Sequence, residues 1–149
     1  MTLCPPFSAN VRQQTSESAM PRVHHIALWA SDIDRICDFY SRAFKATIGP
    51  LYANKAKGFT SRFLSFEDGA SIEVMASTAL SFEPKVSGMQ RLGFTHLAIA
   101  LGSEQAVDDL ARQLRDQGVE VIDGPRRTGD GYYECVALDP EGNRVEITA

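Results

Sequence analysis

The sequence lacks several features that mark large classes of protein. Its hydrophobic stretches are no longer than a strand, which excludes a transmembrane helix. Positive charge is not in excess, because the formal net charge is −4, and no basic stripe or aromatic ladder suggests nucleic acid. The sequence therefore predicts a protein with neither a membrane nor a nucleic acid as its partner.

Cysteine is also scarce. The chain has three cysteines, Cys4, Cys37 and Cys135, which are widely spaced and form no CxxC motif. This pattern excludes a disulfide framework and a cysteine-based zinc or redox site, and we interpret Cys37 and Cys135 as small packing residues. Because the first 20 residues lack the apolar core of a signal peptide, a cytoplasmic location is predicted.

The beginning of the chain differs from the rest. Residues 1–21 are polar and have no hydrophobic period, which predicts a flexible leader ahead of one domain over 22–149. Met20 lies directly before the first expected strand, so translation from Met1 and from Met20 both remain open. The 44% of hydrophobic residues is enough for one compact core.

The domain contains one pattern of elements twice: a strand, a helix and three more strands. The alternating stretch at 22–30 predicts a strand, and the apolar residues spaced along 32–44 predict an amphipathic helix. The expected elements are strands at 22–30, 46–53, 59–66 and 71–76 with a helix at 32–44, then strands at 94–101, 119–122, 131–138 and 143–148 with a helix at 104–117.

This repeat predicts the fold class. The modules are 22–76 and 94–149, joined by a polar connector at 77–93. Neither module can bury its sheet alone. We therefore expect an α+β domain of two tandem βαβββ modules, with a curved mixed sheet inside and the helices outside.

Each module carries one histidine and one glutamate at matching positions. His25 and His96 are 71 residues apart, and each begins a similar apolar stretch, HIAL and HLAI. Glu73 follows His25 by 48 residues and Glu146 follows His96 by 50. Because side chains alternate along a strand, all four polar residues are expected on the face opposite the helices.

Two histidines and two glutamates in one cleft are a donor set for a divalent metal. Imidazole nitrogen and carboxylate oxygen suit zinc, nickel, cobalt, manganese or iron, and leave positions for water or substrate. Taken singly, each glutamate is more typical of an exposed position on a wet sheet face than of a metal ligand. The repeat is what favours the metal site.

Four stretches resemble the ligand motifs of the vicinal oxygen chelate superfamily: HHIAL, ASIEVM, THLAIAL and DPEGNRVEI. The resemblance covers about 22–148 and is most specific in the last motif. Glyoxalase I, bleomycin-resistance proteins and extradiol dioxygenases belong to this superfamily. The resemblance implies a cup of two modules, a homodimer, a small-molecule substrate and a divalent metal held by His25, Glu73, His96 and Glu146.

The ligand set is most similar to that of bacterial glyoxalase I. That similarity implies a lyase or isomerase in which Glu146, or Glu73 by near symmetry, moves a proton of the substrate. An iron-dependent dioxygenase and a non-catalytic drug-binding protein are the alternatives. The arginine that holds glutathione in glyoxalase I has no match near Trp29. The resemblance therefore does not imply glutathione as a co-substrate. We expect Trp29, Phe63 and Tyr133 to line the cleft.

Overall fold

The computed structural model describes residues 21–81 and 92–149. The predicted leader and the middle of the connector, 1–20 and 82–91, lie outside the described residues. The elements are β1 His25–Trp29, α1 Ile33–Phe44, β2 Thr47–Ile48, β3 Tyr52–Asn54, the 3-10 turn η1 Lys55–Lys57, β4 Phe59–Ser65, β5 Ser71–Ser77, β6 Leu97–Ala100, α2 Glu104–Asp116, β7 Val121–Arg127, β8 Tyr133–Leu138 and β9 Arg144–Thr148. This order confirms the predicted repeat.

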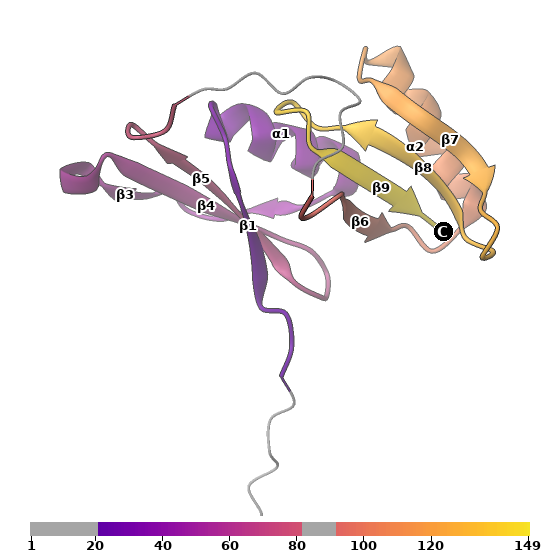
Figure 1. The fold of residues 1–149 in the computed structure, drawn as a ribbon, viewed down its shortest axis with the longest axis horizontal. Helices are drawn as coiled ribbons and strands as arrows, with labels where there is room; N and C mark the ends of the chain where they lie inside the picture. Colours follow the sequence, from indigo (N-terminus) through magenta and orange to yellow (C-terminus); the bar gives the residue numbers. More distant parts are fainter. Residues whose placement is uncertain (1–20, 82–91) are drawn as a thin grey trace, which may run out of the picture.

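The two modules build their sheets in the same way. In the first, five strands are ordered β1-β5-β4-β2, with β3 also paired to β4 (Figure 1). In the second, four strands are ordered β6-β9-β8-β7. In each module the first strand runs parallel to the last, and the remaining pairs are antiparallel.

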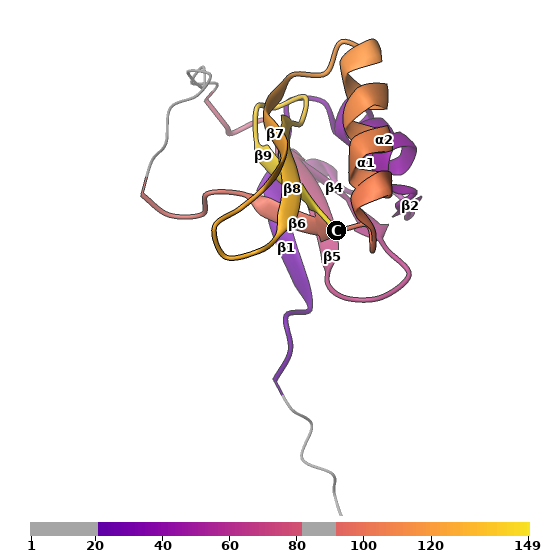
Figure 2. The same ribbon diagram turned by 90° about the vertical axis from the view of Figure 1, so that its right-hand side faces the viewer.

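The helices begin where the sequence predicts. Asp32 caps α1 by accepting a hydrogen bond from the backbone N–H of Arg35, and Ser103 caps α2 by accepting one from that of Ala106. Both helices lie on the same side of the strands (Figure 2). The opposite face of each sheet, called the open face below, carries no helix within residues 21–81 and 92–149.

The core lies between the helices and the sheets. It includes Ile36 and Tyr40 of α1, Leu110 of α2, and the fully buried strand residues Val74 and Ile147. The predicted packing residues Cys37 and Cys135 are buried here as free thiols. Since Val74 and Ile147 each neighbour a glutamate in sequence, their burial turns both glutamates toward the open face.

Several strands differ from their predicted ranges. The strand predicted at 94–101 covers only Leu97–Ala100, so His96 lies one residue before β6. The stretch predicted as one strand at 46–53 forms two short strands, β2 and β3. The strand predicted to end at residue 122 continues through Gly124-Pro125 to Arg127, with register shifts against β8. The pair Gly124-Pro125 is typical of a turn, but here it lies within an irregular strand pairing.

The fold class is the predicted one, although the described strands form two separate sheets. β1 pairs with β5 only and β6 with β9 only, so each sheet has one of these strands at an edge. The modules meet instead through the turn between β8 and β9, where the Tyr40 hydroxyl donates to the carboxylate of Asp139 over 3.3 Å. Among the described residues, no helix is long and apolar enough to cross a membrane.

Candidate functional site

The first module pairs the predicted histidine and glutamate on its open face. Glu73 lies in the middle of β5, between Ile72 and Val74, which are buried on the helix side. The Nε2 atom of His25 at the start of β1 lies 3.7 Å from a carboxylate oxygen of Glu73. The side chain of His25 is 38% exposed and that of Glu73 is 19% exposed, so both remain accessible to a ligand.

The second module repeats this pair. The Nε2 atom of His96 lies 3.2 Å from a carboxylate oxygen of Glu146 on β9. The side-chain exposures are 39% and 19%, almost the same as in the first module. The register is equivalent as well: Glu73 lies opposite Ala27 and Phe63, and Glu146 lies opposite Ala98 and Val136. We call each His–Glu pair a half-site.

In both half-sites, the residue before the histidine contacts its Nδ1 atom. The hydroxyl of Thr95 lies 3.1 Å from Nδ1 of His96, and Nδ1 of His24 lies 2.8 Å from Nδ1 of His25. Each contact leaves Nε2 as the nitrogen directed to the glutamate. Alternation along the strand placed His24 on the opposite face from His25, and this contact was not predicted. The signal in the sequence was a hydrogen-bonding residue directly before each histidine.

The structure brings the four predicted ligands together in two pairs. Among the described residues, no group of three or more His, Cys, Asp or Glu side chains is close enough to hold a metal ion. His25 and His96 do line one open cleft of about 2140 Å³ between the modules. This volume exceeds the 300–1,000 Å³ of ordinary ligand pockets.

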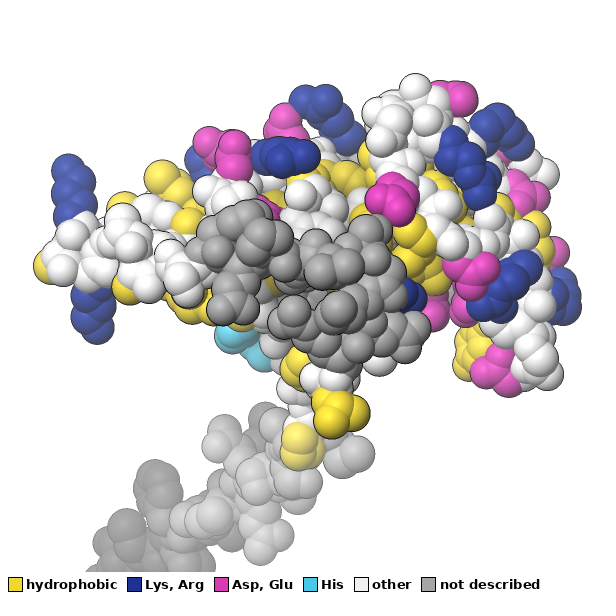
Figure 3. Space-filling model, turned by 45° about the horizontal axis from the view of Figure 1, so that its top comes forward, with side chains coloured by type: hydrophobic (Ala, Val, Ile, Leu, Met, Phe, Trp, Pro, Cys, Tyr) yellow, Lys and Arg dark blue, Asp and Glu magenta, His cyan; other side chains and the backbone are white. Residues whose placement is uncertain are grey.

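The predicted cleft residues Trp29 and Phe63 lie on the open face of the first module. The Phe63 ring contacts His25 edge to face, with 5.4 Å between the ring centroids. Two aromatic residues that were not predicted, Tyr52 and Phe59, continue this surface. In Figure 3, histidine side chains lie at the surface next to hydrophobic ones.

Tyr133, also predicted to line the cleft, lies on the other side of its sheet. Its hydroxyl donates to Asp108 of α2 over 2.7 Å, and the Arg127 guanidinium lies over its ring. The hydrogen bond to Asp108 raises the pKa of Tyr133. Because its alternate neighbours Cys135 and Ala137 are buried under α2, strand alternation turns Tyr133 toward the helix. Tyr133 therefore faces α2 and not the open face on which Glu146 lies.

The open face of the second module is charged near its half-site. Arg126 on β7 pairs with Asp123 over 2.7 Å and lies 3.6 Å from Glu134 on β8. Burial, and then the charge of Glu146, raise the pKa of Glu134. The two half-sites therefore share their ligand pair but differ in what surrounds it.

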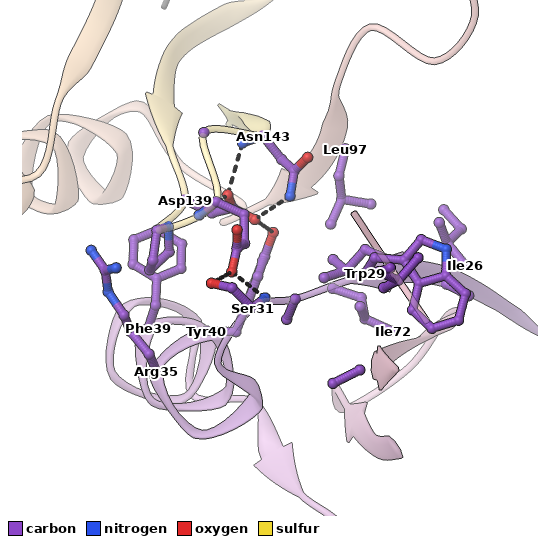
Figure 4. Close-up of a pocket in the computed structure, with 18 of the residues that line it drawn as sticks. Ile26, Trp29, Ser31, Arg35, Phe39, Tyr40, Ile72, Leu97, Asp139 and Asn143 are labelled. Carbon is purple, nitrogen blue, oxygen red and sulfur yellow. Dashed lines mark hydrogen bonds between the residues drawn. The ribbon is translucent and has the colours of Figure 1, made fainter. Parts of the chain in front are cut away.

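The turn between β8 and β9 connects the second half-site to the first module. Asp139 is buried and accepts hydrogen bonds from the backbone of Glu141 and Asn143 and from the Asn143 side chain (Figure 4). In the same turn, Glu141 accepts hydrogen bonds from the backbone and the hydroxyl of Ser31. These contacts fix the start of β9 against the start of α1.

Known proteins resemble this chain in sequence. The glyoxalase domain-containing protein RDO1 of Mycosarcoma maydis is 25% identical over 93% of the chain and 73% of its own length. An uncharacterized protein of Pseudomonas aeruginosa is 28% identical over 86% of the chain and 88% of its own length.

Solved structures share the fold. Glyoxalase I of Zea mays matches with a TM-score of 0.69 and 22% identity over 85% of the chain, although the chain spans only 44% of the maize protein. The trypanothione-dependent glyoxalase I of Leishmania major matches with a TM-score of 0.67 and 18% identity, over 87% of the chain and 86% of its own.

The family match covers most of the domain. Residues 22–147 match the family described as the glyoxalase/bleomycin resistance protein/dioxygenase superfamily. This range includes both half-sites and both modules, and it agrees with the motifs of the vicinal oxygen chelate superfamily. The chain belongs to the glyoxalase/bleomycin resistance protein/dioxygenase superfamily.

Proposed function

We propose that the protein is a metal-dependent enzyme of the glyoxalase I type. It would act on a small carbonyl compound or its hemithioacetal and move a proton between neighbouring carbon atoms. The observation that carries this proposal is the repeated half-site, His25–Glu73 and His96–Glu146, on the open faces of the two modules.

The four side chains fit a divalent metal by their chemistry. Each half-site offers an Nε2 atom and a carboxylate 3.2–3.7 Å apart, on side chains that are accessible and not packed in the core. Nickel, zinc, cobalt, manganese and iron all accept such ligands, and the residues do not select among them. When bound, the metal would supply Lewis acidity toward two neighbouring oxygens of the substrate.

We further propose that two copies of the chain complete each site. The cleft that holds His25 and His96 is wider than a small molecule requires, and the edge strands β1 and β6 are available for pairing. In a symmetric homodimer, the first half-site of one copy would meet the second half-site of its partner, and the same contact would form twice. Two equivalent sites would result.

The chain's own carboxylates would carry the proton. Glu146 is the proposed base, and Glu73 occupies the equivalent position in the other module. Each glutamate lies between buried aliphatic residues and is only 19% exposed, which keeps its carboxylate at a fixed place on the sheet. Metal binding and proton transfer would therefore use the same small set of side chains.

Metal analysis of protein purified without chelator tests the proposal. We expect one divalent metal ion per chain, together with turnover of methylglyoxal mixed with one of several thiols. Iron with oxygen uptake would instead identify a dioxygenase. Absence of bound metal together with tight binding of a drug or metabolite would identify a binding protein, and either result would contradict the proposed lyase.

A further inference from the structure

Four aromatic side chains lie on the open face of the first module, three of them in contact with one another and the fourth in contact with His25. We call Trp29, Tyr52, Phe59 and Phe63 the aromatic platform. Phe59 contacts both Trp29 and Tyr52, with 6.2 Å between the ring centroids in each pair. Trp29 is 48% exposed, Tyr52 57% and Phe63 37%, so the rings are available to a ligand.

The platform adjoins the first half-site. Phe63 contacts the His25 ring and lies directly across from Glu73 on the neighbouring strand. On the other side of Glu73 lies Ala27, which is exposed and separates His25 from Trp29 along β1. The small Ala27 side chain leaves space between the imidazole and the indole ring.

The fold itself does not require these rings. The second module builds the same strand order with Ala100 at the position equivalent to Trp29 and Val136 at the position equivalent to Phe63. Phe59 differs, because Tyr132 stands at its equivalent position and is also exposed. The exposed rings of Trp29 and Phe63 are therefore the two that the shared fold does not explain. They point to a ligand that lies on one module only.

The open face of the first module carries little charge of its own. On the open face of the described strands β1, β3, β4 and β5, Glu73 is the one charged side chain. Arg62 of β4 faces the helix side, where it contacts Asp34 and the carbonyl of Gly49. Beside these strands, Lys55 directly follows β3 and lines the same cleft as Trp29 and Phe59.

We infer that the aromatic platform binds a flat aromatic group of the substrate, while two neighbouring oxygens of the same molecule lie at the half-site. Aromatic rings bind such groups by stacked or edge-to-face contacts in addition to the burial of apolar area. The inference rests on the proposed metal-dependent function and names the substrate class for it.

A matched pair of chelators tests this inference. Benzohydroxamate and acetohydroxamate both bind metals through two neighbouring oxygens and differ in a phenyl and a methyl group. With Zn²⁺-loaded protein, calorimetry should give a Kd for benzohydroxamate lower by roughly ten-fold or more, because the phenyl group buries more apolar area. Trp29 is the single tryptophan of the chain, so its fluorescence reports binding at the platform.

Variants show whether the preference for benzohydroxamate depends on the aromatic platform. Trp29→Ala and Phe59→Ala should each reduce the ratio of the two Kd values toward one while leaving the Kd of acetohydroxamate unchanged. Tyr132→Ala is the control, since Tyr132 is 60% exposed but lies outside the platform. Equal Kd values in the wild type, or a preference kept in both platform variants, would overturn the inference. Loss of the dimer in Trp29→Ala with the preference intact would assign the surface to the partner copy and overturn it too.

An experiment without metal distinguishes a failure of this inference from a failure of the proposed function. If the purified protein holds no metal and binds none, the proposed function fails. The platform is then tested with benzamide, followed through the single indole N–H signal in an NMR spectrum. A shift of that signal that is abolished in Phe59→Ala supports the platform, and an unchanged signal overturns it.

Discussion

His24 and Thr95 each precede a proposed ligand histidine directly in the sequence. Each contacts the Nδ1 atom of that histidine. A group that holds one imidazole nitrogen fixes the orientation of the ring and the nitrogen that remains for the metal. The two modules use different residues for this contact, so the second histidine of HHIAL is the proposed ligand and the first is its support.

Removal of these supports should weaken metal binding without unfolding the protein. We expect Thr95→Val and His24→Ala each to raise the Kd for Zn²⁺ by about 10- to 100-fold, because the imidazole loses its fixed orientation. Thr95→Ser keeps the hydroxyl and should retain the wild-type Kd. Competition with a fluorescent zinc chelator measures the effect, and an unchanged Kd in both variants would show that these contacts do not position the ligands.

The two glutamates should differ in kinetics. If Glu146 is the base, Glu146→Gln should lower kcat by about 10² to 10⁴ while most of the metal remains, held by the three other ligands. Glu73→Gln is the matched control and should lower kcat less. Metal content and kcat are measured on the same samples. Wild-type turnover in both variants would exclude either glutamate as the base.

Among the elements, the turn from β8 to β9 carries a buried hydrogen bond between the two modules. Burial raises the pKa of Asp139, although the hydrogen bonds from Asn143, Glu141 and Tyr40 favour its carboxylate. The turn therefore holds a buried polar group that is costly to leave unmatched. This carboxylate connects the start of β9 to α1.

Replacing Asp139 should destabilise the whole domain. Asp139→Ala removes hydrogen bonds from two backbone N–H groups, an amide and a tyrosine hydroxyl, and we expect a loss of about 2 to 4 kcal/mol in the free energy of unfolding. Tyr40→Phe removes one long hydrogen bond and should cost about 1 kcal/mol or less. Urea unfolding measures both. An Asp139→Ala loss no larger than that of Tyr40→Phe would contradict this role.

The positions of helices and strands could be predicted from the sequence where a single local rule determines them. Both helices follow from a capping residue and an apolar stripe. β7 is longer than the strand predicted at 119–122 and contains Gly124-Pro125, a pair typical of a turn. Gly124 has a φ of +73°, and an added Cβ would lie 2.5 Å from the carbonyl oxygen of Glu134, so the irregular pairing depends on a contact between strands that sequence does not show. The orientation of Tyr133 likewise depends on which neighbours α2 buries.

At the scale of the whole molecule, the repeat predicted the fold and the half-sites, but not how the halves meet. His25 and Glu73 share a face because alternation along two strands is a local rule. In the proposed dimer, the meeting of the two half-sites depends on which copy supplies the strand beside β1 and β6. Pairing within a chain and pairing between chains use the same kind of edge, so sequence patterns do not distinguish them.

Mixing two defective chains tests whether two copies complete each site. One variant carries His25→Ala and Glu73→Ala, and the other carries His96→Ala and Glu146→Ala. Each alone should be inactive, because every site lacks one half-site. After subunit exchange, a mixed dimer has one intact site, so about a quarter of wild-type activity should return.

Two measurements of the oligomeric state serve as controls for the mixing experiment. Light scattering of the wild type should give twice the chain mass of 16.3 kDa. Native mass spectrometry should detect the mixed dimer with one bound metal ion. Mixed dimers without metal and without activity would show that the four ligands do not come from two chains.

The contact between Tyr40 and Asp139 has a further consequence if each chain contributes to two sites. Tyr40 lies in the helix that follows His25, and Asp139 lies in the turn that precedes Glu146. One chain then carries a buried contact between two separate centres, and we expect occupation of one centre to alter the affinity of the other through that contact. Metal binding to the dimer would be cooperative, with a Hill coefficient different from one, and a shorter or looser β8–β9 turn would bring that coefficient back toward one.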